Sequence, residues 1–276
     1  MLDLRTGRVT SFGWSGDAVA SGFTRPGAGG IVAVGAVPHS ELNSRIIRYT
    51  SRGRDRKVLW TGFYGGSIVA RGGKTLAVGG DSGLELVDSG GRGVIRRLPV
   101  PHVGAGCAPI RWWTVTKVLA TCAASELPGS DAQRLWLVPT GGARPTALTP
   151  QRPDHGGDQG DFSAWRLNSG LYLEAMAARC GSHVVARQDS HGAATDIRVP
   201  GAVDITIDTA TASRLLVQRR ASCETVSTSL AWFNPATRKL TVAVAARHGV
   251  WGVSAVVPYY VQGKRQQPRW GRAPAA

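Results

Sequence analysis

Apolar residues alternate with polar ones in short runs that end at Gly, Pro or Asn, a pattern typical of β-hairpins rather than helices. One motif recurs along the chain: a short apolar run, a polar turn and a second apolar run. Its copies lie at residues 2–12, 46–60, 84–98, 135–148, 183–199 and 230–242. Further pairs of apolar runs lie between the copies, at residues 67–78, 111–121 and 204–217. Each repeat therefore predicts four antiparallel strands.

Four strands per repeat is the pattern of a propeller blade. Six such repeats of 46 residues would fill the 276-residue chain, so we predict an all-β, six-bladed β-propeller. Residues 2–12 supply only an outer hairpin, and residues 250–257 form a run with no hairpin after it. We expect both termini to complete one blade, which would hide an exposed sheet edge. Five blades, or seven with an N-terminal part missing, are the alternatives, and residues 173–179 also fit a short helix.

The chain contains no linker, so we expect residues 1–263 to form a single propeller domain, followed by a basic, disordered tail at residues 264–276. The longest uncharged apolar stretch, residues 249–263, is fifteen residues long and is interrupted by Ser254, Pro258 and Gln262. A membrane-spanning helix needs about twenty apolar residues. The sequence therefore predicts no transmembrane segment. We also expect a monomer.

Three short motifs resemble catalytic or ligand-binding sequences. Residues 80–83 (Gly-Asp-Ser-Gly) match the surroundings of a protease nucleophile, but no histidine has the matching context and the flanking runs predict a hairpin turn. Residues 72–75 (Gly-Gly-Lys-Thr) lack the first glycine of a phosphate-binding loop and precede a strand. The acidic loop at residues 154–161 lacks the spacing of a calcium site, so we expect a solvated loop. We predict no catalytic, cofactor-binding or metal-binding residues, and no cofactor.

The nine tryptophans could in principle stack nucleic-acid bases. Trp112 and Trp113 are adjacent in a predicted strand, so they point to opposite faces and cannot form one platform. Trp60, Trp136 and Trp232 each lie in a predicted hairpin strand. We interpret these side chains as packing between blades.

The four cysteines, Cys107, Cys122, Cys180 and Cys223, show no CxxC spacing. An even number without metal spacing indicates two disulfides and hence an oxidising compartment. Met1 opens directly into a polar segment, so an extracytoplasmic location requires a signal segment upstream of Met1. The alternative is a cytoplasmic protein with free thiols.

Four cysteines allow three pairings. A tight turn places Cys122 opposite Pro109, which leaves Cys107 only two residues beyond and within reach of a disulfide. Cys180 and Cys223 each precede the outer hairpin of their own repeat, so they should lie on neighbouring blades. We predict disulfides Cys107–Cys122 and Cys180–Cys223.

Several segments resemble the TolB-like translocation proteins of high-GC Gram-positive bacteria. They are Cys107-Ala-Pro-Ile-Arg-Trp-Trp113, Val118-Leu-Ala-Thr-Cys122, Leu135-Trp-Leu-Val-Pro139 with Thr146-Ala-Leu-Thr-Pro150, Gly160-Asp-Phe-Ser-Ala-Trp165, Ser169-Gly-Leu-Tyr-Leu173 and Leu230-Ala-Trp-Phe-Asn-Pro235. The likeness covers roughly residues 100–245. It implies a six-bladed propeller exported to the cell envelope, and it implies no catalytic residues.

The net charge of +15 raises affinity for anionic partners without choosing among them, because the basic residues are spread along the whole chain. Our leading interpretation is a non-enzymatic, exported propeller that binds a protein or an anionic envelope polymer through loops on one face. One alternative is a cytosolic scaffold or nucleic-acid-binding propeller, which free thiols would favour. The other is a propeller enzyme of the hydrolase, lyase or quinoprotein type, although sialidase boxes are absent.

Overall fold

The computed structural model describes residues 23–24, 30–36, 43–50, 56–63, 68–71, 74–80, 82–101, 106–124, 133–150, 160–177, 182–222, 224, 228–245, 260–261 and 264–265. Within these ranges every regular element is a β-strand. In the same part of the chain, no helix has the length and apolar character needed to cross a membrane.

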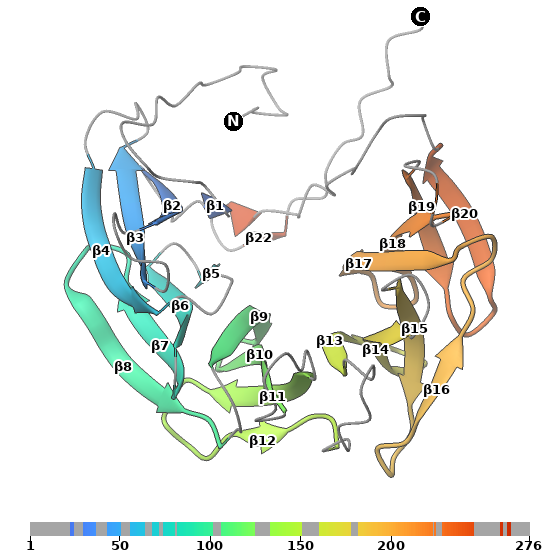
Figure 1. Cartoon of the computed structure of the whole chain (residues 1–276), viewed down its shortest axis with the longest axis horizontal. Helices are drawn as coiled ribbons and strands as arrows, with labels where there is room; N and C mark the ends of the chain where they lie inside the picture. Colours follow the sequence, from blue (N-terminus) through green and yellow to red (C-terminus); the bar gives the residue numbers. More distant parts are fainter. Residues whose placement is uncertain are drawn as a thin grey trace, which may run out of the picture. The chain divides into compact units, whose positions relative to one another are not determined.

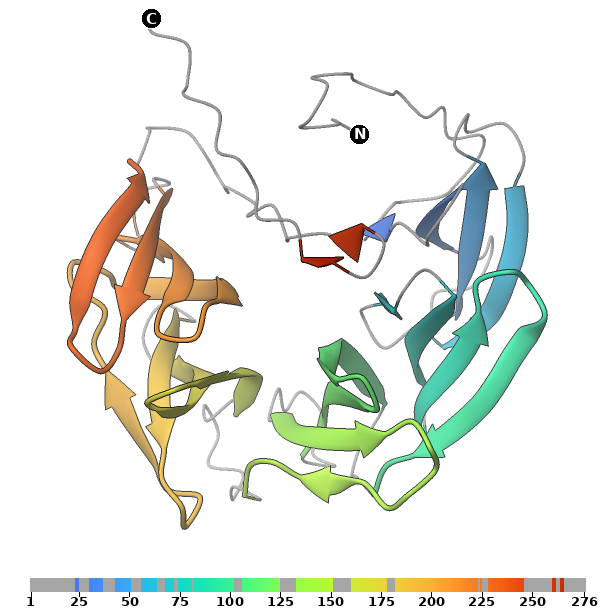
Figure 2. The same ribbon diagram turned by 180° about the vertical axis from the view of Figure 1, so that it is seen from behind.

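The strands pair with their sequence neighbours in antiparallel order, as Figure 1 shows from one side and Figure 2 from behind. The strands are β1 (Phe23–Thr24), β2 (Gly30–Ala36), β3 (Asn43–Thr50), β4 (Arg56–Phe63), β5 (Ile68–Arg71), β6 (Thr75–Gly80), β7 (Gly83–Asp88), β8 (Gly93–Pro99), β9 (Cys107–Thr114), β10 (Lys117–Ala123), β11 (Gln133–Pro139), β12 (Thr146–Ala147), β13 (Asp161–Leu167), β14 (Gly170–Ala177), β15 (Ser182–Gln188), β16 (Ala194–Ile197), β17 (Asp204–Ala210), β18 (Leu215–Arg220), β19 (Thr228–Asn234), β20 (Lys239–Val244), β21 (Tyr260–Val261) and β22 (Lys264–Arg265).

The chain divides into two compact units, each described here by itself. Unit 1 holds the four-stranded sheets β1–β4, β5–β8 and β9–β12. In unit 2, strands β13–β16 and β17–β20 form two groups of four that are joined into one sheet by a single pairing, His183 with Ile205. Strands β21 and β22 form a small separate hairpin.

The predicted four-strand repeats are confirmed wherever the structure describes them. The outer hairpins expected from the alternation are β3–β4, β7–β8, β11–β12, β15–β16 and β19–β20. The helix considered for residues 173–179 is wrong: β14 runs through residue 177, because pairing with β13 and β15 satisfies its backbone on both sides.

The remaining expectations about domains and closure fall largely outside the described residues. The structure does not describe residues 2–12 and 250–257, which we expect to complete one blade. The blade count therefore stays a prediction. Lys264 and Arg265, the first residues of the predicted tail, pair with β21, and residues 266–276 are not described.

In the sheet β5–β8, the central strands β6 and β7 are buried on both faces, whereas most of β8 is exposed. Successive side chains of a strand point to opposite faces. Leu76 and Val78 of β6 accordingly pack with Ile46 and Trp60 of the preceding sheet, whereas Ala77 packs with the following sheet. Both clusters lie within unit 1, and both faces are apolar because each is covered by a neighbouring sheet.

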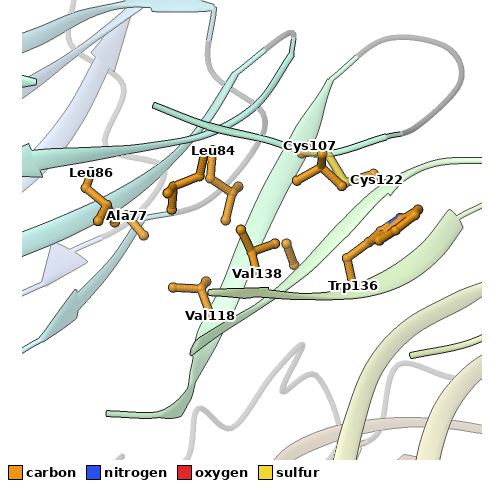
Figure 3. Close-up of a cluster of buried hydrophobic side chains, with 11 residues drawn as sticks. Ala77, Leu84, Leu86, Cys107, Val118, Cys122, Trp136 and Val138 are labelled. Atoms are coloured by element: carbon orange, nitrogen blue, oxygen red, sulfur yellow. A yellow bond between two sulfur atoms is a disulfide. The ribbon is translucent and has the colours of Figure 1, made fainter. Parts of the chain in front are cut away.

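The cluster between the sheets β5–β8 and β9–β12 is drawn in Figure 3. Ala77 and Leu84 lie on one side of it, and Val118 and Val138 lie on the other. Unit 2 has a matching cluster between its two groups of strands, in which Tyr172 and Phe233 are among the largest fully buried side chains. Packing between successive sheets therefore supplies the core of each unit.

Candidate functional site

A disulfide joins Cys107 at the start of β9 to Cys122 near the end of β10. Ala123 N donates to Gly106 O, so the next pair inward, Cys107 and Cys122, is a non-hydrogen-bonded antiparallel pair. Its Cα atoms are 4.1 Å apart. Both cysteines are buried in the cluster of Figure 3. This geometry confirms the predicted Cys107–Cys122 pairing.

The register that leads to this pairing differs from the one expected. The turn places Lys117 opposite Thr114, and a regular ladder from there would set Cys122 opposite Pro109. Two register shifts along β9 instead place Pro109 opposite Ala120 and Cys107 directly opposite Cys122. Each β-bulge adds one residue to the bulged strand, so two bulges account for the difference of two residues.

Arg134 lies beside this disulfide, because it pairs in register with Cys122. Its Nε donates to Thr149 O at 2.8 Å, and its guanidinium lies over the ring of Trp136, 5.0 Å from the centroid. Burial lowers the pKa of the Arg134 guanidinium. The other predicted pair, Cys180 and Cys223, lies outside the described residues and stays a prediction.

The described residues of the motifs that resemble catalytic sequences lie in turns or at strand ends. Gly80 ends β6 and pairs with Gly83, which begins β7, so Ser82 belongs to a tight hairpin turn. Gly83 has φ +142°, and a Cβ added there would lie 2.3 Å from Leu98 O, so the turn requires glycine. Thr75, which follows the Gly-Gly-Lys sequence, opens strand β6 and not a helix.

The structure describes little of the acidic loop at residues 154–161. Asp161, its last residue, is buried at the start of β13. Among the described residues there is no cluster of His, Cys, Asp and Glu that could hold a metal ion. Whether the rest of the loop binds a cation lies outside the described part of the chain.

A polar contact between the first two sheets of unit 1 was not signalled by any sequence motif. Trp60 Nε1 on β4 donates to Glu85 Oε2 on β7 at 2.6 Å, and Arg97 Nε on β8 donates to Glu85 Oε1 at 3.0 Å. Glu85 therefore joins a buried indole to an exposed guanidinium. Trp60 packs between sheets, as predicted for the hairpin tryptophans.

The turn between β7 and β8 is organised by Asp88. Its carboxylate accepts from the side chain and the backbone N of Arg92, both at 3.1 Å. The hydrogen bond from the Arg92 side chain is the largest cause that lowers the pKa of Asp88. Gly91 follows with φ +90°, and the Lys57 side chain lies against it.

We expect Asp88→Asn to be less stable than the wild type at pH 7, because asparagine keeps one acceptor but loses the charge. A carboxylate with a lowered pKa stabilises the folded state above its unfolded pKa of about 3.9 and loses this contribution as the pH falls through its folded value. The difference in urea midpoint between the two proteins should therefore shrink below about pH 4. A difference that stays constant from pH 7 to pH 3 would contradict the role of the charge.

The turns at this end of unit 1 contact one another. Ser89 N of the β7–β8 turn donates to Lys74 O at 3.0 Å, and Lys57 Nζ donates to Gly90 O at 3.5 Å. Thr140 N of the β11–β12 turn donates to Thr116 O at 2.9 Å. Arg96 of β8 connects the two groups of turns.

Arg96 Nη1 donates to Thr140 O at 3.4 Å, which links β8 to the β11–β12 turn. The contacts thus run from β4 through the β7–β8 turn and β8 to the β9–β10 and β11–β12 turns. They place residues from the same end of three successive sheets on one continuous surface.

No family model and no curated protein matches the chain. Among solved structures, TolB from Acinetobacter baumannii aligns with a TM-score of 0.51 and 16% identity over 82% of this chain and 53% of that one. The Agrobacterium tumefaciens protein assigned as TolB aligns with a TM-score of 0.53 and 13% identity over 90% of this chain and 89% of that one. The chain has a TolB-like β-propeller fold.

The TolB-like fold confirms the predicted fold class, while the link to high-GC Gram-positive bacteria stays a prediction. The chain spans about half the length of the Acinetobacter protein. Prolyl oligopeptidase B from Galerina marginata also aligns, with a TM-score of 0.50 and 12% identity over 79% of this chain and 33% of that one. At these identities the likeness concerns the fold alone.

Proposed function

We propose that this chain is an exported, non-enzymatic TolB-like propeller that binds a protein or an anionic polymer in the cell envelope. The observation that carries the proposal is the buried Cys107–Cys122 disulfide within a TolB-like fold. Structural disulfides persist in oxidising compartments outside the cytoplasm and are rare inside it. The arrangement of the pair supports a structural bond, because both sulfurs are covered by the apolar cluster between two sheets.

The compartment is tested on protein taken from its native cells, acid-quenched and alkylated before lysis, by non-reducing peptide mapping. We expect a Cys107–Cys122 crosslinked peptide in the extracytoplasmic fraction. A cytosolic protein with exposed thiols, mapped from the same lysate, controls for oxidation during handling. Free thiols at Cys107 and Cys122 in the cytosolic fraction would contradict the proposal.

The non-enzymatic part of the proposal is tested separately, since one structure with a similar fold is a prolyl oligopeptidase. The purified full chain is expected to leave a prolyl peptide substrate uncut over hours at micromolar concentration. Multiple turnovers that survive repeated purification would overturn this part and leave the compartment result standing.

A further inference from the structure

The continuous surface formed by the turns of unit 1 is strongly basic. Lys57, Lys74, Arg92, Lys117 and Arg144 all lie on it and are all exposed. We call these five residues the basic turn surface. They come from three successive sheets: Lys57 from β4, Lys74 and Arg92 from the turns of the sheet β5–β8, and Lys117 and Arg144 from the sheet β9–β12.

Among the residues that the structure describes, little negative charge offsets this surface. Among the described residues of unit 1, Glu85 and Asp88 are the acidic ones, and each is paired with an arginine, Arg97 and Arg92 respectively. Asp88 is also buried, so its carboxylate is largely withdrawn from solvent. Lys74, Lys117 and Arg144 have no ion pair with any residue that the structure describes. Their charges are therefore available to a ligand.

We propose that the basic turn surface is a docking site for a linear polyanion whose chain carries repeated phosphate or carboxylate groups. The proposal rests on the proposed function and deepens it by assigning the binding face and the chemistry of the partner. Lysine contacts such groups as a mobile point charge and arginine as a planar donor. Five exposed basic side chains from three sheets, one of which (Arg92) is ion-paired with Asp88, can contact successive charges along one extended chain.

The composition of the surface favours a polymer over a folded protein. Protein interfaces rely on a desolvated core of aromatic or large apolar anchors. The turns carry glycines, including Gly90, Gly91 and Gly142. Large apolar side chains are exposed at or near the turns, namely Val115, Val58, Val94 and Ile95, but all four are aliphatic and none is an aromatic anchor. Exposed cations beside glycines and aliphatic side chains provide charge without an aromatic anchor.

The same composition argues against single-stranded nucleic acid. Proteins that bind it combine basic grooves with aromatic side chains on which bases stack. The adjoining strand β9 has two tryptophans: Trp112 packs against the buried cluster, and the ring of Trp113 is covered by the Arg111 guanidinium, 5.5 Å from the ring centroid. Charge contacts to a polymer backbone remain as the chemistry that this surface supports.

The test compares the full-length wild type with Lys74→Gln/Lys117→Gln/Arg144→Gln. The matched control, Arg166→Gln/Arg198→Gln/Lys239→Gln, removes the same charge from exposed positions of unit 2. The probes are long-chain inorganic polyphosphate and poly-L-glutamate, with Kd measured at 50 to 200 mM salt. All three proteins should share the same thermal midpoint, because the changed residues are exposed.

We expect the unit 1 variant to bind its polyanion about tenfold or more weakly at low salt. The slope of log Kd against the logarithm of the salt concentration should fall by about two to three, because fewer counterions are released on binding when three cationic contacts are lost. The control should stay within about threefold of the wild type. Binding of polyphosphate, of polyglutamate or of both supports the proposal and identifies which anionic group is read.

Three outcomes would overturn the proposal. Equal weakening of both variants would mean that net charge, and not this surface, binds the polymer. Failure of the wild type to bind either probe at 50 mM salt would exclude a polyanion as the ligand, and the proposed function would then be limited to binding a protein. Tighter binding of single-stranded DNA than of either probe would assign the surface to nucleic acid.

Discussion

Phe233→Ala is expected to lower the free energy of unfolding by about 4 kcal/mol, within the range for large-to-small changes of buried aromatic residues. Phe233 of β19 is fully buried, and it pairs in register with Leu215 of β18 and Leu240 of β20. It belongs to the cluster between the two groups of strands in unit 2. Removing the ring leaves a cavity that these β-sheet neighbours can fill only by distorting their ladders. Urea denaturation followed by tryptophan fluorescence measures the loss.

Two further variants separate packing from strand propensity. Phe233→Leu keeps most of the apolar volume and should cost roughly 1 to 2 kcal/mol. Val242→Ala changes a residue of the neighbouring strand that is 48% exposed, and it should cost less than about 1 kcal/mol. Equal destabilisation by Phe233→Ala and Val242→Ala would show that Phe233 is not a core residue.

Cys107→Ala/Cys122→Ala is expected to lower the free energy of unfolding by about 3 kcal/mol. The disulfide joins residues with a sequence separation of 15. A cross-link across a loop of this length lowers the conformational entropy of the unfolded chain, which raises the free energy of the unfolded state by about 3 kcal/mol. The two alanines also remove sulfur atoms from a buried cluster, so the loss has a small packing component.

Reduction provides the control for the disulfide variant. In the presence of a strong reductant the wild type and the double variant should differ by less than about 1 kcal/mol, because neither then carries the bridge. Any other disulfide of the chain is reduced equally in both proteins. A difference that persists under reduction would assign the effect to packing instead of the cross-link.

The strands were predictable from the sequence because their signal is local. Alternating apolar residues between turn formers located the hairpins of residues 84–98 and 230–242 at the positions of β7–β8 and β19–β20. Residues 173–179 were ambiguous because Glu, Ala and Met favour helices. Pairing with two neighbouring strands overrides that propensity in β14.

The disulfide was predictable as a pair but not as a register. One of the two shifts along β9 falls at Pro109, and a proline inside a strand is typical of bulges and edge strands. Proline alone does not specify which residues of β10 lie opposite β9, so the register could not be predicted from the sequence. The contact of Trp60 with Glu85 is of the same kind, since it joins residues of two different sheets. Such contacts depend on how the sheets pack, which alternation does not encode.

The basic turn surface could not be predicted from the linear distribution of charge in the sequence. Lys74, Arg92, Lys117 and Arg144 are far apart in the sequence, so they form no basic run. In a four-stranded antiparallel sheet the first and third turns lie at the same end, which gathers these residues together. The surface thus depends on which turns share one end of the sheets and not on any local run of basic residues.

Cys107 and Cys122 lie opposite each other only because of the two bulges of β9, so the disulfide can form only when the two strands are in this register. A β9–β10 hairpin without bulges would hold Cys122 opposite Pro109 and leave the two thiols out of line. Oxidation can therefore form the disulfide in the hairpin with the bulged register and not in the hairpin without bulges. Once closed, the bond prevents β9 from sliding along β10, so an oxidising environment would fix the register of this sheet as well as stabilise it.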